Sequence, residues 1–128
     1  MTILLDTHMF IWATSEPERL GNYREVIEDP TEEVALSVAS AWEIAIKHGV
    51  GKISLPEQPS SYVTSRIAML GLRAIDVKLD LALGVESLPL YQRDPFDRLL
   101  IATARKLDMR LLTVDRRMEE YDVTVLHP

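Results

Sequence analysis

Four carboxylates stand in the chain where a strand is predicted to pass into a helix. Asp6 and Asp115 each follow directly on a short apolar run. Glu43 lies about one turn into a predicted helix after a second apolar run, and Asp97 lies in the first turn of another predicted helix. Because ligands of open α/β sheets bind outside the carboxyl ends of the strands, we expect these four side chains to converge on one rim.

Carboxylates crowded on one rim repel each other, and some would have to take up protons unless a cation lies between them. Hard oxygen ligands suit Mg²⁺ or Mn²⁺. The chain has no cysteine, and His8, His48 and His127 are scattered along it, which argues against zinc. A divalent cation held in this way can hold a phosphate oxygen and activate a water, so the pattern favours phosphodiester hydrolysis.

Three hydroxyl side chains lie close to these acids in the sequence, namely Thr7, Ser40 and Thr113. Their hydroxyls could hold metal-bound waters or orient the carboxylates. Local capping or packing explains each of them equally well, so they are supporting candidates only.

Each acid taken alone also has an ordinary structural explanation. Asp6 and Asp115 could cap the helical turns that follow them, and the sequence from Ser40 to Glu43 matches a capping box. In "DPFDR", Asp94 suits the N-cap, and Asp97 suits the third helical position, where a carboxylate faces free backbone N–H groups. The interpretation as a site therefore depends on the four acids acting together.

Short apolar runs alternate with helical patterns along the chain, which predicts βα units, a parallel sheet and an α/β fold with three layers (α/β/α). Nearly all strand residues are apolar, as expected where helices cover both faces of a short, mostly parallel central sheet. The predicted strands are 2–6, 32–37, 72–77, 110–114 and 123–126. The predicted helices are a turn within "HMFIWA" and the segments 18–28, 38–49, 60–70, 78–87 and 95–108.

The composition is that of a globular protein, with 47% hydrophobic and 27% charged residues among 128, so we expect a single domain over residues 1–128. The first residues lack the basic start of a signal peptide, and no apolar segment is long enough to span a membrane. Together with the missing cysteine, this is compatible with a cytoplasmic location.

The formal net charge of −6 argues against binding duplex nucleic acid through its backbone. The basic residues are unevenly distributed, however, because residues 93–117 carry seven of the 14 lysines and arginines. Within that segment, Arg98, Arg116 and Arg117 adjoin two of the acids and could contact an RNA backbone.

Four segments, in this order and spacing, resemble the PIN-domain toxins of the VapBC type: "LLDTHMFIW", "SVASAWEIAIKHGVGKISL", "DPFDRLLIATA" and "LLTVDRRMEEYDVTVL". The resemblance runs from Ile3 to Leu126, and "DPFDRLLIATA" is its most specific part. One small departure is Thr103, which stands where close relatives often have Gln.

The resemblance implies a metal-dependent endoribonuclease, the toxin of a toxin–antitoxin pair, with its acids in one pocket that binds Mg²⁺ or Mn²⁺. It assigns the four family acids, as catalytic residues and metal ligands, to Asp6, Glu43, Asp97 and Asp115, with Glu43 as a candidate for proton transfer. Asp94 is then mainly the helix cap, with a possible secondary role in the site.

The resemblance also implies partners. These are an RNA substrate, an antitoxin that covers the active site and carries the DNA-binding region, and a homodimer or a toxin–antitoxin heteromer. Four aromatic residues could form a sticky surface, although core packing explains such residues more often: Phe10, Trp12, Trp42 and Tyr62.

Three other functions fit some of the pattern. A phospho-receiver module also has Mg²⁺-binding acids at strand ends, but it needs adjacent acids after the first strand and a late lysine, and no lysine follows residue 106. A binding module could use the acids only to dock an antitoxin arginine. A metal-dependent phosphatase acting on small substrates is the third alternative.

Overall fold

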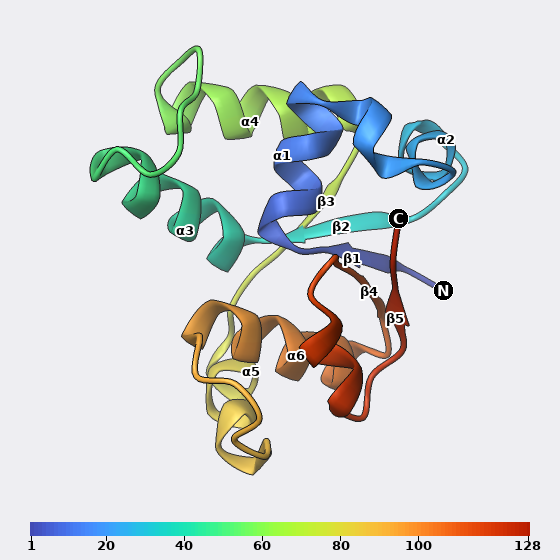
Figure 1. The fold of residues 1–128 in the computed structure, drawn as a ribbon, viewed down its shortest axis with the longest axis vertical. Helices are drawn as coiled ribbons and strands as arrows, with labels where there is room; N and C mark the ends of the chain where they lie inside the picture. The colour runs from blue at the N-terminus through green and yellow to red at the C-terminus, as the bar shows by residue number, and fades with distance from the viewer.

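Five short strands form one sheet in the computed structural model, which describes every residue from Met1 to Pro128. The strand order is β3-β2-β1-β4-β5, and every neighbouring pair is parallel (Figure 1). The strands are β1 (Ile3–Leu5), β2 (Val34–Ser37), β3 (Arg73–Ile75), β4 (Arg110–Leu112) and β5 (Val125–Leu126). All five lie within the segments predicted from the sequence, and the three-layer α/β fold is confirmed.

Helices cover both faces of the sheet (Figure 1). One face carries α1 (Thr7–Ser15), α2 (Tyr23–Glu28), α3 (Val38–Gly49) and α4 (Pro59–Leu70), and the other carries α5 (Leu79–Leu83) and α6 (Pro95–Leu107). Three short 3₁₀ helices complete the fold: η1 (Pro17–Leu20), η2 (Gly84–Ser87) and η3 (Arg116–Glu120). None of the helices has both the length and the apolar character needed to cross a membrane.

Alternation along β1 divides the apolar core between the two layers of helices. Successive side chains of a strand point to opposite faces of the sheet. Ile3 and Leu5 accordingly pack in the cluster beneath α1 to α4, whereas Leu4 packs in the cluster beneath α5 and α6. All three side chains are almost fully buried, which explains why the strand reads as a continuous apolar run rather than an alternating one.

Two predicted helices prove to be divided. Residues 18–28, predicted as one helix, form η1 and α2, because Gly21 between them has a φ of 56°, in the left-handed region that ends a helix. Residues 78–87 form α5 followed directly by the tighter η2. The turn predicted within "HMFIWA" is longer than expected, since α1 runs from Thr7 to Ser15.

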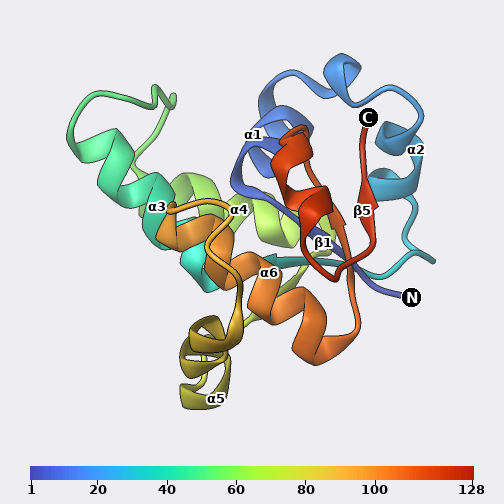
Figure 2. The same cartoon turned by 60° about the horizontal axis from the view of Figure 1, so that its bottom comes forward.

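The central strand β1 pairs with β2 on one side and with β4 on the other. From β1 the chain proceeds outward through β2 and β3, then returns to add β4 and β5 on the opposite side (Figure 1). Figure 2 shows β5, in red, leading to the C-terminus at the end of this path. The direction of growth therefore reverses between β1 and β4. A crevice opens outside the carboxyl ends of strands at such a reversal, and Asp6 and Asp115 follow these two strands.

Candidate functional site

Asp6 and Asp115 follow the neighbouring strands β1 and β4, Asp6 directly after Leu5 and Asp115 three residues after Leu112. Asp6 is the N-cap of α1, where its side chain accepts a hydrogen bond from the backbone N–H of Met9 at 2.8 Å. Asp115 is the N-cap of η3 and accepts from the backbone N–H of Arg117 at 3.0 Å. Both carboxylates are therefore fixed by the first turn of the helix that they begin.

Glu43 enters the site from inside α3. That helix is capped by Ser37, whose hydroxyl accepts from the N–H of Ala39 at 3.1 Å. The helix begins at residue 38, as predicted, and the alternative explanation of Ser40 and Glu43 as a capping box is wrong because the cap lies three residues earlier. Glu43 instead points inward and is only 5% exposed. Its two carboxylate oxygens accept hydrogen bonds from the Thr7 hydroxyl and the Lys47 ammonium group.

The first turn of α6 holds two further acids. Asp94 is the N-cap and accepts from the N–H groups of Phe96 and Asp97, at 2.9 and 3.0 Å, with Pro95 at the first helical position. The helix start predicted from "DPFDR" is confirmed. Asp97 is half-buried, and no protein hydrogen bond engages its side chain oxygens.

These acids meet in one cavity of about 290 Å³. The four predicted acids, Asp94 and Thr7 all line it, so the convergence expected from the topology is observed. The full lining is Asp6, Thr7, His8, Glu43, Lys47, Asp94, Asp97, Val114, Asp115 and Arg117.

The two remaining hydroxyl candidates lie behind the cavity wall. Thr113 is fully buried, and its hydroxyl accepts from the N–H of Asp115 at 3.0 Å. Burial raises the pKa of Asp6, and a hydrogen bond with Thr113 offsets part of that rise. Thr113 thus connects the acids that follow β1 and β4. Ser40 is buried in α3 with an unpartnered hydroxyl oxygen and does not line the cavity.

The crowding of negative charge has a direct electrostatic consequence at Asp97. Burial raises its pKa most, and the nearby Asp94, Asp6, Glu43 and Asp115 raise it further, to about 7. Burial also raises the pKa of Asp6. The protein thus spends free energy to keep these carboxylates together, which is typical of functional rather than structural placement.

Two cations of the cavity offset part of this charge. Arg117 forms a two-pronged ion pair with Asp115, Nε to Oδ1 at 3.0 Å and Nη2 to Oδ2 at 2.8 Å, and these hydrogen bonds hold the pKa of Asp115 below its usual range. Lys47 pairs with Glu43, which raises the pKa of the ammonium group. Lys47 was not predicted; its spacing of four residues from Glu43 on one helix was the available signal.

The other two predicted arginines lie outside the cavity. Arg116 is exposed and lies 3.5 Å from Glu119. Arg98, although next to Asp97 in the chain, directs its guanidinium to backbone carbonyls, including that of Pro89 at 2.8 Å. Its placement gives no support to the predicted RNA contact.

The donor set of the cavity suits a hard divalent cation. All five acids offer carboxylate oxygens, and the only imidazole in the lining is that of His8. Such ligands suit Mg²⁺ or Mn²⁺ rather than zinc. No three of these groups are already arranged to enclose a cation. To bind a metal, Glu43 would have to give up its ion pair with Lys47, and Asp115 its ion pair with Arg117.

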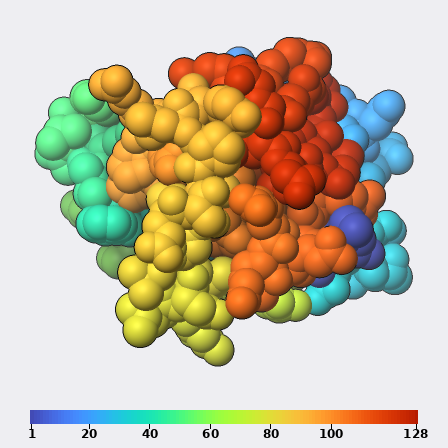
Figure 3. All heavy atoms as spheres, turned by 90° about the horizontal axis from the view of Figure 1, so that it is seen from below, coloured from blue at the N-terminus to red at the C-terminus, as the bar shows by residue number.

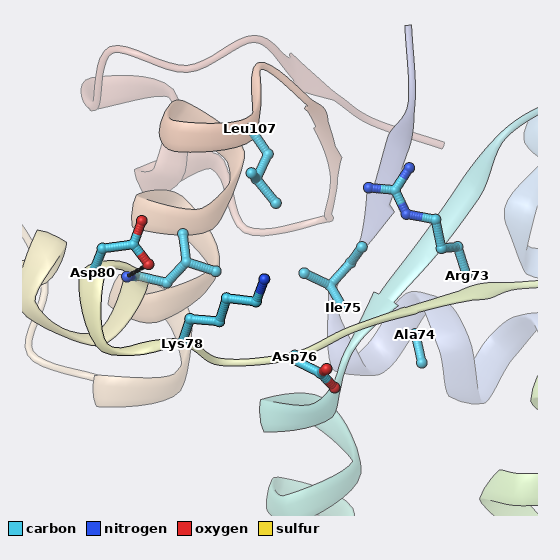
Figure 4. Close-up of a pocket in the computed structure, with 8 residues that line it drawn as sticks. Arg73, Ala74, Ile75, Asp76, Lys78, Asp80 and Leu107 are labelled. Atoms are coloured by element: carbon cyan, nitrogen blue, oxygen red, sulfur yellow. Dashed lines mark hydrogen bonds between the residues drawn. The ribbon is translucent and has the colours of Figure 1, made fainter.

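A second hollow, of about 330 Å³, lies beside the edge strand β3 and shares no residue with the acidic cavity. Ile75 projects toward it from β3 and Leu107 from α6 (Figure 4). Its charged side chains are of both signs: Arg73, Asp76, Lys78 and Asp80. Because these charges are balanced, this hollow lacks the concentrated negative charge of the acidic cavity, and it lies at the edge strand rather than between the central strands β1 and β4.

Fold and site together define an α/β protein with an acidic, oxygen-lined pocket at the reversal point of a parallel sheet. Residues 3–123 match the family of the PIN domain, and the chain belongs to that family. It is 30% identical over 121 residues to ribonuclease VapC22 of Mycobacterium tuberculosis. This alignment covers 94% of this chain and 92% of that protein. This family membership displaces the phospho-receiver alternative.

Solved structures share the fold. VapBC2 from Rickettsia felis, bound to a DNA fragment from its promoter, superposes with a TM-score of 0.75 at 18% identity, over 99% of this chain and 98% of that one. DNA-bound VapBC from Salmonella typhimurium gives a TM-score of 0.73 at 16% identity, over 99% and 98% of the two chains. At such low identity these likenesses show the fold alone.

Proposed function

We propose that this chain is a ribonuclease, the toxin of a toxin–antitoxin pair, which hydrolyses phosphodiester bonds of RNA in the acidic cavity. The observation that carries the proposal is the meeting of five carboxylates from four distant parts of the sequence in one cavity. Membership of the PIN family and the similarity to a protein named as a ribonuclease support it.

We assign Asp6, Glu43, Asp97 and Asp115 to hold Mg²⁺ or Mn²⁺. When bound, such an ion polarises the phosphodiester and lowers the pKa of a water. Asp94 keeps the first turn of α6 in place through its two backbone hydrogen bonds and adds negative charge near Asp97.

The cations of the cavity have a separate role in this proposal. Lys47 and Arg117 pair with carboxylates that the metal would engage, so metal binding would free both to contact the phosphates of the substrate. Arg116 is exposed on the same 3₁₀ helix as Arg117 and could add a weaker contact. Glu43 remains our candidate for accepting a proton at a carboxylate oxygen.

A protein partner is also part of the proposal. The two solved structures described above are named as VapBC, and both are bound to DNA. We propose that this chain likewise pairs with an antitoxin and reaches DNA only through it, in the cytoplasm. An uncovered apolar face supports a partner of some kind, either an antitoxin or a second copy. Its residues are spaced by four along α3 and are all exposed: Val38, Trp42, Ile46 and Val50.

The aromatic residues considered as a sticky surface thus divide. Phe10 and Tyr62 are buried in the core, and Trp12 is half-buried. Only Trp42 belongs to the uncovered face, with 63% of its surface exposed. Its ring packs edge-to-face on Phe96, with ring centroids 5.4 Å apart.

The proposal is tested by incubating a mixed RNA pool with purified, antitoxin-free protein in Mg²⁺, Mn²⁺ or EDTA. We expect cleavage that requires the metal and is lost in Asp6→Asn and Asp97→Asn. Asp76→Asn, which removes an exposed carboxylate outside the cavity, is the matched control and should cleave normally. Cleavage retained in both pocket variants would refute the site. A folded protein that binds an antitoxin but cuts no RNA would favour the binding-module alternative.

A further inference from the structure

One basic side chain of α6 holds a neighbouring segment by its backbone. Arg98 donates from Nη1 to the carbonyl oxygens of Pro89 at 2.8 Å and Gln92 at 3.3 Å. From Nη2 it donates to those of Val85 at 3.2 Å and Leu88 at 3.3 Å. A single planar guanidinium thus satisfies four carbonyls of one short segment, residues 85–92, a geometry that the compact ammonium group of lysine cannot reproduce.

The same contacts reach the C-terminal part of the chain. The phenol oxygen of Tyr121 accepts from the backbone N–H of Gln92 at 3.1 Å and lies 3.4 Å from Nη1 of Arg98. Its ring packs edge-to-face on Tyr91, with centroids 5.0 Å apart, and Tyr121 is only 4% exposed. Figure 3 shows the segment before α6, in gold, directly against the C-terminal segment, in red.

The segment 85–92 anchors itself in the core through Leu88 and Val85, but it also buries a polar side chain without partners. Gln92 is 5% exposed, and neither its amide nitrogen nor its amide oxygen has a hydrogen-bond partner. Buried polar atoms without partners disfavour the conformation that buries them. The backbone hydrogen bonds to Arg98 and Tyr121 therefore have to outweigh this cost.

The network connects α6 and η3, two of the three helices that begin with an acid of the cavity. The segment 85–92 leads directly to Asp94, whose carbonyl accepts from the N–H of Arg98 at 3.1 Å. Tyr121 ends η3, the 3₁₀ helix capped by Asp115. One end of the network thus sets the start of α6, and the other sets the end of η3.

We propose that Arg98 and Tyr121 are positioning residues that fix the acids of α6 and η3 relative to one another. Arg98 touches neither RNA nor metal in this proposal; it acts through the backbone that carries Asp94 and Asp97. The consequence for cleavage rests on the proposed ribonuclease function, whereas the positioning itself does not.

The test uses two variants. Arg98→Lys keeps the positive charge but loses the planar guanidinium that reaches four carbonyls, and Tyr121→Phe removes the phenol oxygen and keeps the ring. Amide hydrogen exchange of the full-length variants is followed at Phe96 and Asp97, whose N–H groups bond to Asp94. We expect exchange there to become about fivefold faster or more in each variant, the effect of losing one net hydrogen bond. In RNA cleavage we expect a lower kcat with KM little changed.

The control is Ile27→Ala, which truncates a buried side chain of α2 in the opposite layer. It should lower the melting temperature, and it should accelerate exchange at Phe96 and Asp97 by no more than its loss of global stability accounts for. Unchanged exchange at these two amides in both network variants would overturn the proposal, as would equal acceleration in Ile27→Ala at a matched loss of stability. If the wild type cuts no RNA, the proposed function fails, but the exchange measurement still decides the positioning role.

Discussion

Replacing Asp97 by Asn should stabilise the metal-free protein at alkaline pH while abolishing cleavage. Burial and neighbouring carboxylates raise the pKa of Asp97 from 3.8 to about 7 in the folded chain. The folded chain therefore binds this proton more tightly than the unfolded chain does. The free energy of unfolding falls as pH rises between these two values, and the full penalty is present above the upper one.

The size of the effect follows from that shift. A rise from 3.8 to about 7 would correspond to about 4 kcal/mol for a fully shielded group. Solvent reaches the cavity and screens the charges, which reduces the penalty to about 2 kcal/mol. The Asn side chain also loses a favourable charge at the N-terminus of α6, worth about 0.5 kcal/mol. We therefore expect Asp97→Asn to be more stable than the wild type by about 1–2 kcal/mol at about pH 8, and nearly equal at about pH 4.

The assay is urea unfolding of both proteins in EDTA across this pH range, with Asp76→Asn as the control for removing an exposed carboxylate. Adding Mg²⁺ should reverse the order, because the cation stabilises a folded state that keeps Asp97. A stability difference that does not change between about pH 4 and pH 8 would refute the argument that Asp97 is held at an electrostatic cost.

Two further predictions follow from the helix start and from the cations of the cavity. Ser37→Ala should lower the free energy of unfolding by about 1 kcal/mol, because it removes the N-cap of α3. Ser40→Ala should leave the free energy of unfolding unchanged or raise it, because the Ser40 hydroxyl is buried without a partner. Equal losses of stability in urea unfolding would contradict the assignment of Ser37 as the cap. Lys47→Met and Arg117→Gln should each reduce the slope of log RNA affinity against log salt concentration by about one unit, and by more than Arg116→Gln does, as measured by fluorescence anisotropy. An unchanged slope in both variants would show that Lys47 and Arg117 do not contact the RNA.

The sequence was sufficient to predict the five strands and the meeting of the acids, because both depend on local pattern and on one topological rule. The short apolar runs ended by Asp6 or Asp115 are too short for typical helices, which favours strands that place the acid near the carboxyl edge. The break at Gly21 was not anticipated, since a glycine is tolerated within many helices and only its positive φ ends this one.

Errors at single residues arose where the facing direction of a side chain decides its role. Asp97 and Arg98 are adjacent in the chain, but adjacent residues of a helix do not share a face, so Asp97 enters the cavity and Arg98 faces the segment 85–92. The helix was predicted to start at residue 38, as it does, but the sequence left Ser40 open as an alternative cap, and only the end of β2 selects Ser37. Lys47 was missed because its role depends on Glu43 facing inward.

The position of β1 at the centre of the sheet has a consequence during protein synthesis. The first acid is made with the first strand, but the fourth follows β4, which pairs beside β1 although β2, β3 and all six α-helices are made between them. A nascent chain that has formed β1, β2 and β3 therefore still lacks one wall of the cavity. Any activity of the cavity can begin only after β4 and Asp115 have left the ribosome and joined the sheet.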